Sequence, residues 1–219
     1  MLILASNSPR RQELLRAAGW SFTVLPADID EEPGSDESAQ NYVLRLAEEK
    51  AKNILRRRQS NIPSQAVIVA ADTTVVLNGQ ILGKPVDAAE AEQMLRRLKG
   101  NTHQVYTGLA VLRIADRSMT IDLTATNVSM RSYSDVEMFA YIATGDPLDK
   151  AGAYAIQHNE FRPVERLQGC YANVVGLPVC KLSRILNDMG QTPTAPPRFI
   201  CTGDSPVACE VAEYFKAND

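Results

Sequence analysis

A serine-rich turn and two arginines near the start of the chain are the residue types of a phosphate-binding site. The apolar residues 1–5 predict a short buried strand, and Ser8 and Pro9 are typical of the N-cap and the first position of a helix. Positive charge in the first turn opposes the helix dipole, so Arg10 and Arg11 indicate an anion bound among them and the helix N–H groups. The alternative is an ordinary capped helix whose arginines are solvated.

Two charged residues stand where the sequence pattern calls for apolar ones. On the helix expected over 38–58, Lys50 shares the apolar stripe, so it either extends to the edge of the core or enters a cleft toward an anion. Asp72 interrupts the apolar strand expected over 66–77, where a buried carboxylate needs a partner. Asp72 is then either hydrogen-bonded at a strand end, or acts as a general base or as a ligand of a hard divalent cation.

Two loop residues carry weaker signals. Lys84 lies between Gly83 and Pro85, directly after an expected hairpin, and this tight loop would fix its position. Gln157 ends a loop that begins at Asp146, and its carboxamide offers a donor and an acceptor to the edge of a base. By local chemistry alone, both side chains fit an ordinary surface position equally well.

Composition narrows the class of protein. The chain has 219 residues, 45% of them hydrophobic, with a net charge of −3 and a pI near 5.5. This charge argues against a nucleic acid polymer as partner, but it allows a single nucleotide. Four cysteines without a CxxC pair, and only two histidines, argue against a structural zinc site. Few cysteines and no signal peptide predict a cytoplasmic location, and no apolar run predicts a membrane span.

Alternating strand and helix patterns predict an α/β fold with a sheet that is not purely parallel. Asn78-Gly79 is a strong type I′ hairpin signal. Strands are expected over 1–5, 22–25, 66–77, 80–82, 104–114, 119–131 and 171–175. Helices are expected over 9–18, 38–58, 87–98, 134–143 and 178–189. The segment from residue 190 is rich in Pro, Thr and Ser, with a further helix expected over 206–216.

Seven segments, in order along residues 1–188, together resemble the Maf family of nucleoside triphosphate pyrophosphatases. They are ASNSPRRQELL (5–15), RLAEEKA (45–51), AADTTVV (70–76), ILGKP (81–85), HQVYTG (103–108), DPLDKAGAYAIQ (146–157) and NVVGLP (173–178). The resemblance implies a mixed twisted sheet with flanking helices, in two lobes around a deep cleft, as in inosine triphosphate pyrophosphatases. It also implies hydrolysis of a nucleoside triphosphate between its α and β phosphates with Mg²⁺ or Mn²⁺, and a homodimer.

The resemblance assigns roles to single residues of this chain. Asp72 matches the catalytic base, and Glu31 falls at an acidic position that would hold metal together with Asp72. The substrate-binding positions are matched by Ser6, Arg10, Arg11, Lys50 and Lys84. The positions that set base preference are matched by Arg10, Thr73 and Gln157. The motif DKAGAYAIQ resembles the subfamily acting on dTTP and UTP, and modified pyrimidine nucleotides are further candidate substrates.

Two stretches depart from the family pattern. The segment after Gln157 is His158-Asn-Glu-Phe-Arg where the family has a glycine-rich stretch, which puts base preference in question. The residues 190–219 have no counterpart, so we expect a Maf-like domain over 1–189 followed by a tail of unknown role. Two alternatives therefore stay open: the same reaction with another base preference, of the 7-methyl-GTP type, or a non-catalytic nucleotide-binding regulator of cell division.

Overall fold

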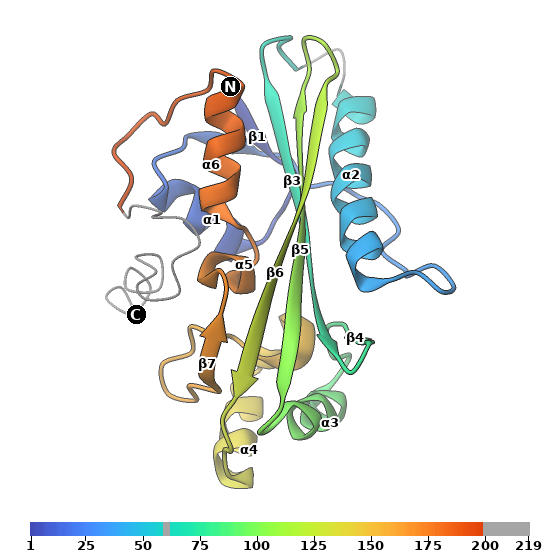
Figure 1. Cartoon of the computed structure of the whole chain (residues 1–219), viewed down its shortest axis with the longest axis vertical. Coiled ribbons are helices and arrows are strands. Elements are labelled where there is room, and N and C mark those ends of the chain that lie inside the picture. The colour runs from blue at the N-terminus through green and yellow to red at the C-terminus, as the bar shows by residue number, and fades with distance from the viewer. Residues whose placement is uncertain (59–61, 199–219) are drawn as a thin grey trace.

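A mixed sheet of seven strands forms the centre of the computed structural model, which describes residues 1–58 and 62–198 (Figure 1). The strand order is β2-β1-β3-β5-β6-β7, and β4 pairs with β3. The pairs β1–β2 and β1–β3 are parallel, and the other pairs are antiparallel. The strands are β1 (Leu2–Leu4), β2 (Phe22–Val24), β3 (Val67–Leu77), β4 (Gln80–Leu82), β5 (Thr102–Arg113), β6 (Met119–Met130) and β7 (Val164–Gln168). The expected α/β fold with a mixed sheet is confirmed.

Helices cover both faces of the sheet. In Figure 1, α2 lies along one face and α1, α5 and α6 lie along the other, while α3 and α4 lie at the far end of the long strands. The helices are α1 (Pro9–Ala17), α2 (Ala39–Arg58), α3 (Ala88–Leu98), α4 (Asp135–Ala143), α5 (Tyr171–Val175) and α6 (Val179–Asp188), with 3₁₀ turns η1 (Asp146–Asp149) and η2 (Ala151–Ala153). Within residues 1–58 and 62–198, no helix is both long and apolar enough to span a bilayer.

The hairpin of β3 and β4 forms where the dipeptide signal placed it. Asn78 and Gly79 have φ angles of 52° and 79°, and Leu77 pairs with Gln80. Positive φ at both central residues is the geometry of a type I′ turn, which Asn and Gly accept with little strain. This turn sets the register that brings Lys84 back toward β3.

A gap in the sheet edge lies beside β3. The parallel pairing with β1 ends at Leu4 and Val69, and the antiparallel pairing with β4 begins at Val75 and Leu82. Between these points, among the strands of residues 1–58 and 62–198, β3 pairs only with β5 on its other side. Because successive side chains of a strand point to opposite faces, residues on both faces of β3 reach the opening at this edge.

Helix α2 packs unusually close to the sheet at Gly108 of β5. A Cβ atom on Gly108 would lie 2.2 Å from the carbonyl oxygen of Val43, so no other residue fits without moving the helix. Val43 and Ala47 on the same helix face are fully buried. This contact fixes the height of α2 above the sheet, and therefore the position of Lys50.

Near the C-terminus one expectation was wrong and one strand was missed. The residues 171–175 form helix α5 instead of a strand. A five-residue apolar run does not by itself distinguish the two; here the Cys170 side chain caps the helix by accepting from the N–H of Asn173, and Gly176 ends it at φ 122°. Strand β7 was not predicted, because its exposed and charged sequence has no apolar alternation. Within the described residues it pairs only with β6.

The first part of the C-terminal segment packs against the end of α1. The N–H groups of Thr194 and Ala195 donate to the carbonyl of Gly19, and that of Arg198 donates to Ala17. Gly19 has φ 83°, and a Cβ there would lie 2.1 Å from the carbonyl oxygen of Ala195. The helix expected over 206–216 lies outside the described residues.

Candidate active site

A cleft of about 640 Å³ opens at the gap in the sheet edge beside β3. All the residues to which the sequence assigned roles line it: Ser6, Arg10, Arg11, Glu31, Lys50, Asp72, Thr73, Lys84 and Gln157. They come from the β1–α1 turn, the first turn of α1, the loop before α2, α2 itself, β3, the exit of the hairpin and the loop after η2. The fold therefore brings together every one of these residues, although the division into two lobes stays a prediction.

The α2 side of the cleft holds a lysine between two carboxylates, which we call the acidic cluster (Glu31, Lys50 and Asp72). The Nζ atom of Lys50 lies 2.6 Å from Oδ1 of Asp72 and 2.6 Å from Oε1 of Glu31. Lys50 and Asp72 are buried, while Glu31 is half exposed. The sequence left open where Lys50 would point, and the structure shows it inside the cleft with carboxylate partners.

The two carboxyl groups of the acidic cluster have pKa values shifted in opposite directions. Burial raises the pKa of Asp72 above its ordinary value, although the nearby charges of Lys50 and Arg11 oppose this rise. Burial also acts on Glu31, but there the hydrogen bond and charge of Lys50 prevail and lower the pKa. Asp72 is thus the stronger base of the two, which is the property a general base requires.

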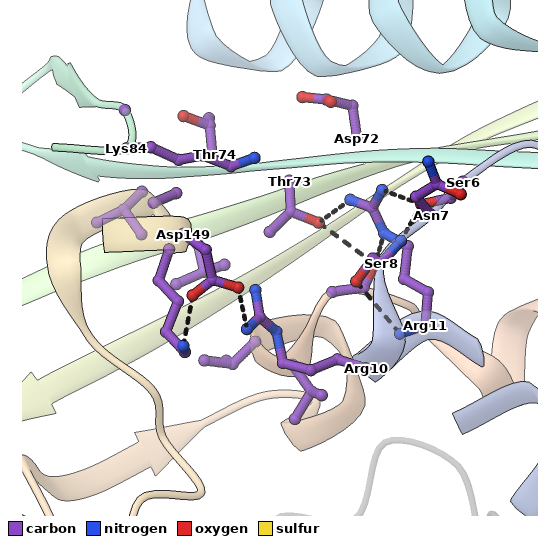
Figure 2. Close-up of a pocket in the computed structure, with 18 of the residues that line it drawn as sticks. Ser6, Asn7, Ser8, Arg10, Arg11, Asp72, Thr73, Thr74, Lys84 and Asp149 are labelled. Carbon is purple, nitrogen blue, oxygen red and sulfur yellow. Dashed lines mark hydrogen bonds and ion pairs between the residues drawn. The ribbon is translucent and has the colours of Figure 1, made fainter. Parts of the chain in front are cut away.

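The opposite side of β3 presents arginines. In Figure 2, Asp72 and Thr73 point to opposite faces of the strand, and Thr73 points toward Arg11. Arg11 donates from Nε to the carbonyl of Gly176 at 2.8 Å, from Nη1 to Ser6 at 3.2 Å and from Nη2 to Thr73 at 3.2 Å. Burial lowers the pKa of Arg11 below its ordinary value, but a guanidinium stays protonated. Arg11 therefore braces the wall of the cleft and keeps two of its five N–H groups for a ligand.

Thr73 is oriented by a chain of buried hydroxyls. Thr107 donates to the carbonyl of Asn173, so in the 2.8 Å contact between the two threonine hydroxyls Thr73 is the donor. Thr73 also lies within donating distance of the Gly176 carbonyl, at 3.3 Å. Its proton is thereby directed into the protein. Toward a ligand in the cleft, the Thr73 oxygen can therefore only accept a hydrogen bond, and it also accepts from Arg11.

Arg10 is held differently from its neighbour. Its Nη1 donates to Oδ2 of Asp149 at 3.3 Å, across the mouth of the cleft (Figure 2). Within the described part of the chain, this is the one protein partner of its guanidinium, so the other N–H groups are available to a ligand. Lys84 and Gln157 line the cleft without a side-chain partner among residues 1–58 and 62–198.

Several residues that build this site had no role in the prediction from sequence. Asp149 and the buried Lys150 line the cleft, and Gly176 supplies the carbonyl that holds Arg11. The run Asp146-Pro-Leu-Asp149-Lys150 did carry a signal, because three charged residues lie within five positions just before Gly152. Gly176 lies in the family segment NVVGLP, but its role as the partner of Arg11 was not predicted, since it depends on the end of a helix where the sequence predicted a strand.

The acidic cluster has the donor chemistry of a magnesium site that a substrate completes. Mg²⁺ is commonly held by one or two carboxylates together with phosphate oxygens and waters. Two carboxylates, those of Glu31 and Asp72, already converge on one cation, the ammonium of Lys50. In the described ranges, no group of three or more His, Cys, Asp and Glu side chains could hold a metal ion by itself. The residues present therefore fit a metal that arrives with a phosphate.

Comparison with known proteins shows which family this chain resembles over most of its length. The family described as Maf-like protein matches residues 1–189. A dTTP/UTP pyrophosphatase of Citrifermentans bemidjiense is 44% identical over 189 residues, covering 86% of this chain and 95% of the relative. The dTTP/UTP pyrophosphatase of Salmonella typhimurium is 47% identical over 187 residues, covering 85% and 91%. That of Geotalea uraniireducens is 45% identical over 189 residues, covering 86% and 95%.

Proposed function

The chain belongs to the Maf family, and we propose that it hydrolyses dTTP and UTP to the nucleoside monophosphate and pyrophosphate. Such a hydrolase removes nucleotides from the pool, which is a house-cleaning activity. Modified pyrimidine nucleotides are further candidate substrates. The segment after Gln157 departs from the family pattern, which leaves the alternative of another base preference open.

One observation carries this proposal: the two sides of β3 present opposite charge to a single cleft. The acidic cluster has two carboxylates for one ammonium, so it keeps a net negative charge that suits a cation. The other side has Arg10 and Arg11 beside the N-terminus of α1, which suits an anion. A triphosphate with its bound cation needs both kinds of surface within one site.

In the proposed reaction, water attacks the α-phosphorus. The water oxygen forms a bond to this phosphorus, its proton passes to the carboxylate of Asp72, and the bond to the bridging oxygen breaks to release pyrophosphate. Negative charge grows on the phosphoryl oxygens and on the leaving group, and Arg10, Arg11 and Lys84 are placed to neutralise it. Lys50 keeps Asp72 in one orientation by its 2.6 Å hydrogen bond.

A divalent metal, Mg²⁺ or Mn²⁺, completes the proposal. Glu31 and Asp72 would hold it, and it would supply charge neutralisation at the phosphate oxygens. Asp72 would then be base, metal ligand or both, and these roles are separated by the metal dependence of Asp72 variants.

Base preference is proposed to rest on Arg10, Thr73 and Gln157. All three line the cleft, and the amide of Gln157 is available to the edge of a base. Thr73 contributes by fixing Arg11, as its hydrogen bonds indicate.

The decisive test is turnover of a nucleotide panel by the purified protein with Mg²⁺, with pyrophosphate and orthophosphate measured separately. Pyrophosphate together with dTMP or UMP is the expected result. Pyrophosphate from other bases would keep the reaction and discard the base preference. Binding without turnover of any nucleotide would favour the non-catalytic regulator instead.

Three further proposals concern the whole protein. The enzyme domain is residues 1–189, the span of the family match, and the residues 190–219 form an appended tail. The protein is cytoplasmic, where its nucleotide substrates are, and it forms a homodimer as the family resemblance implies. Sedimentation analysis of the full chain, and of a chain ending at residue 198, tests the dimer and the tail together.

A further inference from the structure

A buried lysine stands behind the ion pair at the mouth of the cleft. Lys150 is 7% exposed, and its Nζ donates to Oδ1 of Asp149 at 2.6 Å. It also donates to the carbonyl oxygen and to Oδ1 of Asp146, each at 2.7 Å. Three short hydrogen bonds from one ammonium leave Lys150 without a proton for a substrate. Its role is therefore to hold the 3₁₀ turn η1.

The hydrogen bonds that hold the turn η1 continue into the protein core. Oδ2 of Asp146 accepts from the hydroxyl of Tyr141 at 2.7 Å, and the same hydroxyl accepts from the N–H of Ala155 at 3.0 Å. Tyr141 is 2% exposed and stacks on Phe161 with ring centroids 4.4 Å apart. The turn that carries Asp149 is thus anchored to α4, and the anchor also fixes the chain two residues before Gln157.

Asp149 uses its two oxygens for two different purposes. Oδ1 is held by Lys150, while Oδ2 accepts from Nη1 of Arg10 at 3.3 Å. The Asp149 side chain itself is 63% exposed, whereas its lysine partner is buried. Burial raises the pKa of Asp149, but Lys150 and Arg10 outweigh this and lower it below its ordinary value, so the carboxylate stays charged. An exposed carboxylate with one oxygen fixed from the core can orient a long arginine that nothing else in the described residues holds.

We propose that Asp149, clamped by Lys150, is a positioning residue that orients the guanidinium of Arg10 toward the triphosphate. This inference rests on the proposed function, because it assigns Arg10 to substrate binding. Asp149 accepts from one nitrogen of the Arg10 guanidinium and leaves its other N–H groups available to phosphate oxygens. Ordering a long side chain before binding saves about 0.5–1.5 kcal/mol, which corresponds to about two- to twelve-fold in affinity.

The test is a double-mutant cycle of Asp149→Asn and Arg10→Ala, measured as kcat and KM for dTTP with Mg²⁺. Asp149→Asn alone is expected to raise KM about fivefold and to leave kcat within about twofold. In the Arg10→Ala background the same substitution should change KM less than about 1.5-fold, because the group it orients is gone. Equal effects in both backgrounds, or a fall in kcat without a rise in KM, would overturn the proposal.

A matched control excludes the general loss of an exposed ion pair. Asp116 accepts from Nη1 of Arg113 at 3.5 Å and does not line the cleft, so Asp116→Asn should leave KM unchanged. Binding of a non-hydrolysable α,β-methylene dTTP analogue, followed by calorimetry in the same variants, separates this inference from the proposed function. Binding that is weakened by Asp149→Asn only when Arg10 is present supports the inference even without turnover, and no binding by the unaltered protein overturns both.

Discussion

The two sides of β3 both join carboxylates to cations, yet they do so in opposite surroundings. On the α2 side, Lys50 and Asp72 are buried, and burial raises the pKa of the carboxyl group. On the α1 side, the carboxylate of Asp149 is 63% exposed, and its two cations lower its pKa despite partial burial. The same kind of pair thus gives a proton acceptor on one side and a permanent charge that orients an arginine on the other.

The backbone explains how two such environments share one cleft. Asp72 and Thr73 are neighbours in the chain, but a strand directs their side chains to opposite faces. The gap between β1 and β4 exposes both faces at one edge. A ligand at this edge can therefore contact a cation-binding surface and an anion-binding surface at once.

The largest effect is expected on the α2 side. Asp72→Asn should lower kcat by about 10²–10⁴-fold, because general-base catalysis contributes about this much, while Lys50 retains Glu31 as a partner. The rate of pyrophosphate release measures kcat, and an unchanged thermal midpoint shows that the variant keeps its fold. Asp122→Asn is the matched control. Oδ1 of Asp122 lies 2.8 Å from Nζ of Lys181, and Asp122 does not line the cleft. Full turnover by the Asp72 variant would remove this residue from the mechanism.

The free energy of unfolding is expected to depend on pH through the buried His103. His103 contacts the hydroxyl of Tyr154 at 2.7 Å, and burial lowers its pKa from 6.5 to about 4. Between these values the unfolded state binds more protons, so the free energy of unfolding should fall as pH falls from 6.5 to 4, by about 3 kcal/mol. Urea denaturation at pH 7 and pH 4 should show this loss, and His103→Gln should reduce it. An equal loss in the variant would assign the pH dependence to other groups.

The close contact between α2 and Gly108 of β5 should be sensitive to one added methyl group. Gly108→Ala places a Cβ against the Val43 carbonyl, and relief of this overlap should cost about 1–3 kcal/mol of unfolding free energy. It should also lower turnover, since the helix that carries Lys50 must move. Gly83→Ala is the control, because a Cβ there meets no atom within 4 Å. Equal thermal midpoints for the two variants would show that α2 adapts freely.

The smallest effect is expected at Gln157. Gln157→Ala should change the ratio of kcat/KM for dTTP against other triphosphates by about two- to twelve-fold, the value of one hydrogen bond, with little change in stability. The readout is the nucleotide panel, with Asn159→Ala on the neighbouring exposed loop as control. A substrate profile that stays the same would exclude Gln157 from base recognition.

Local sequence determined much of the frame of this protein. Ser8 and Pro9 predicted the start of α1, and Asn78 and Gly79 predicted the hairpin. The position of Lys50 on an apolar stripe predicted a lysine at the edge of the core or in a cleft. These features were predictable because each depends on the conformation or the periodicity of residues close together in the chain. The resemblance to one family assigned roles to residues that all line the cleft, although it assigned none to Asp149 or Lys150.

Only the tertiary structure decided what these residues do to one another. The pairing of β7 with β6 depends on partners far apart in the sequence. The same is true of the hydrogen bond from Arg11 to the Gly176 carbonyl and of the contact of Arg10 with Asp149. Arg10 and Asp149 are separated by 139 positions in the sequence. Burial and pairing over such separations arise only when the chain has folded, so the pKa of Asp72 and the orientation of Arg10 are properties of the fold.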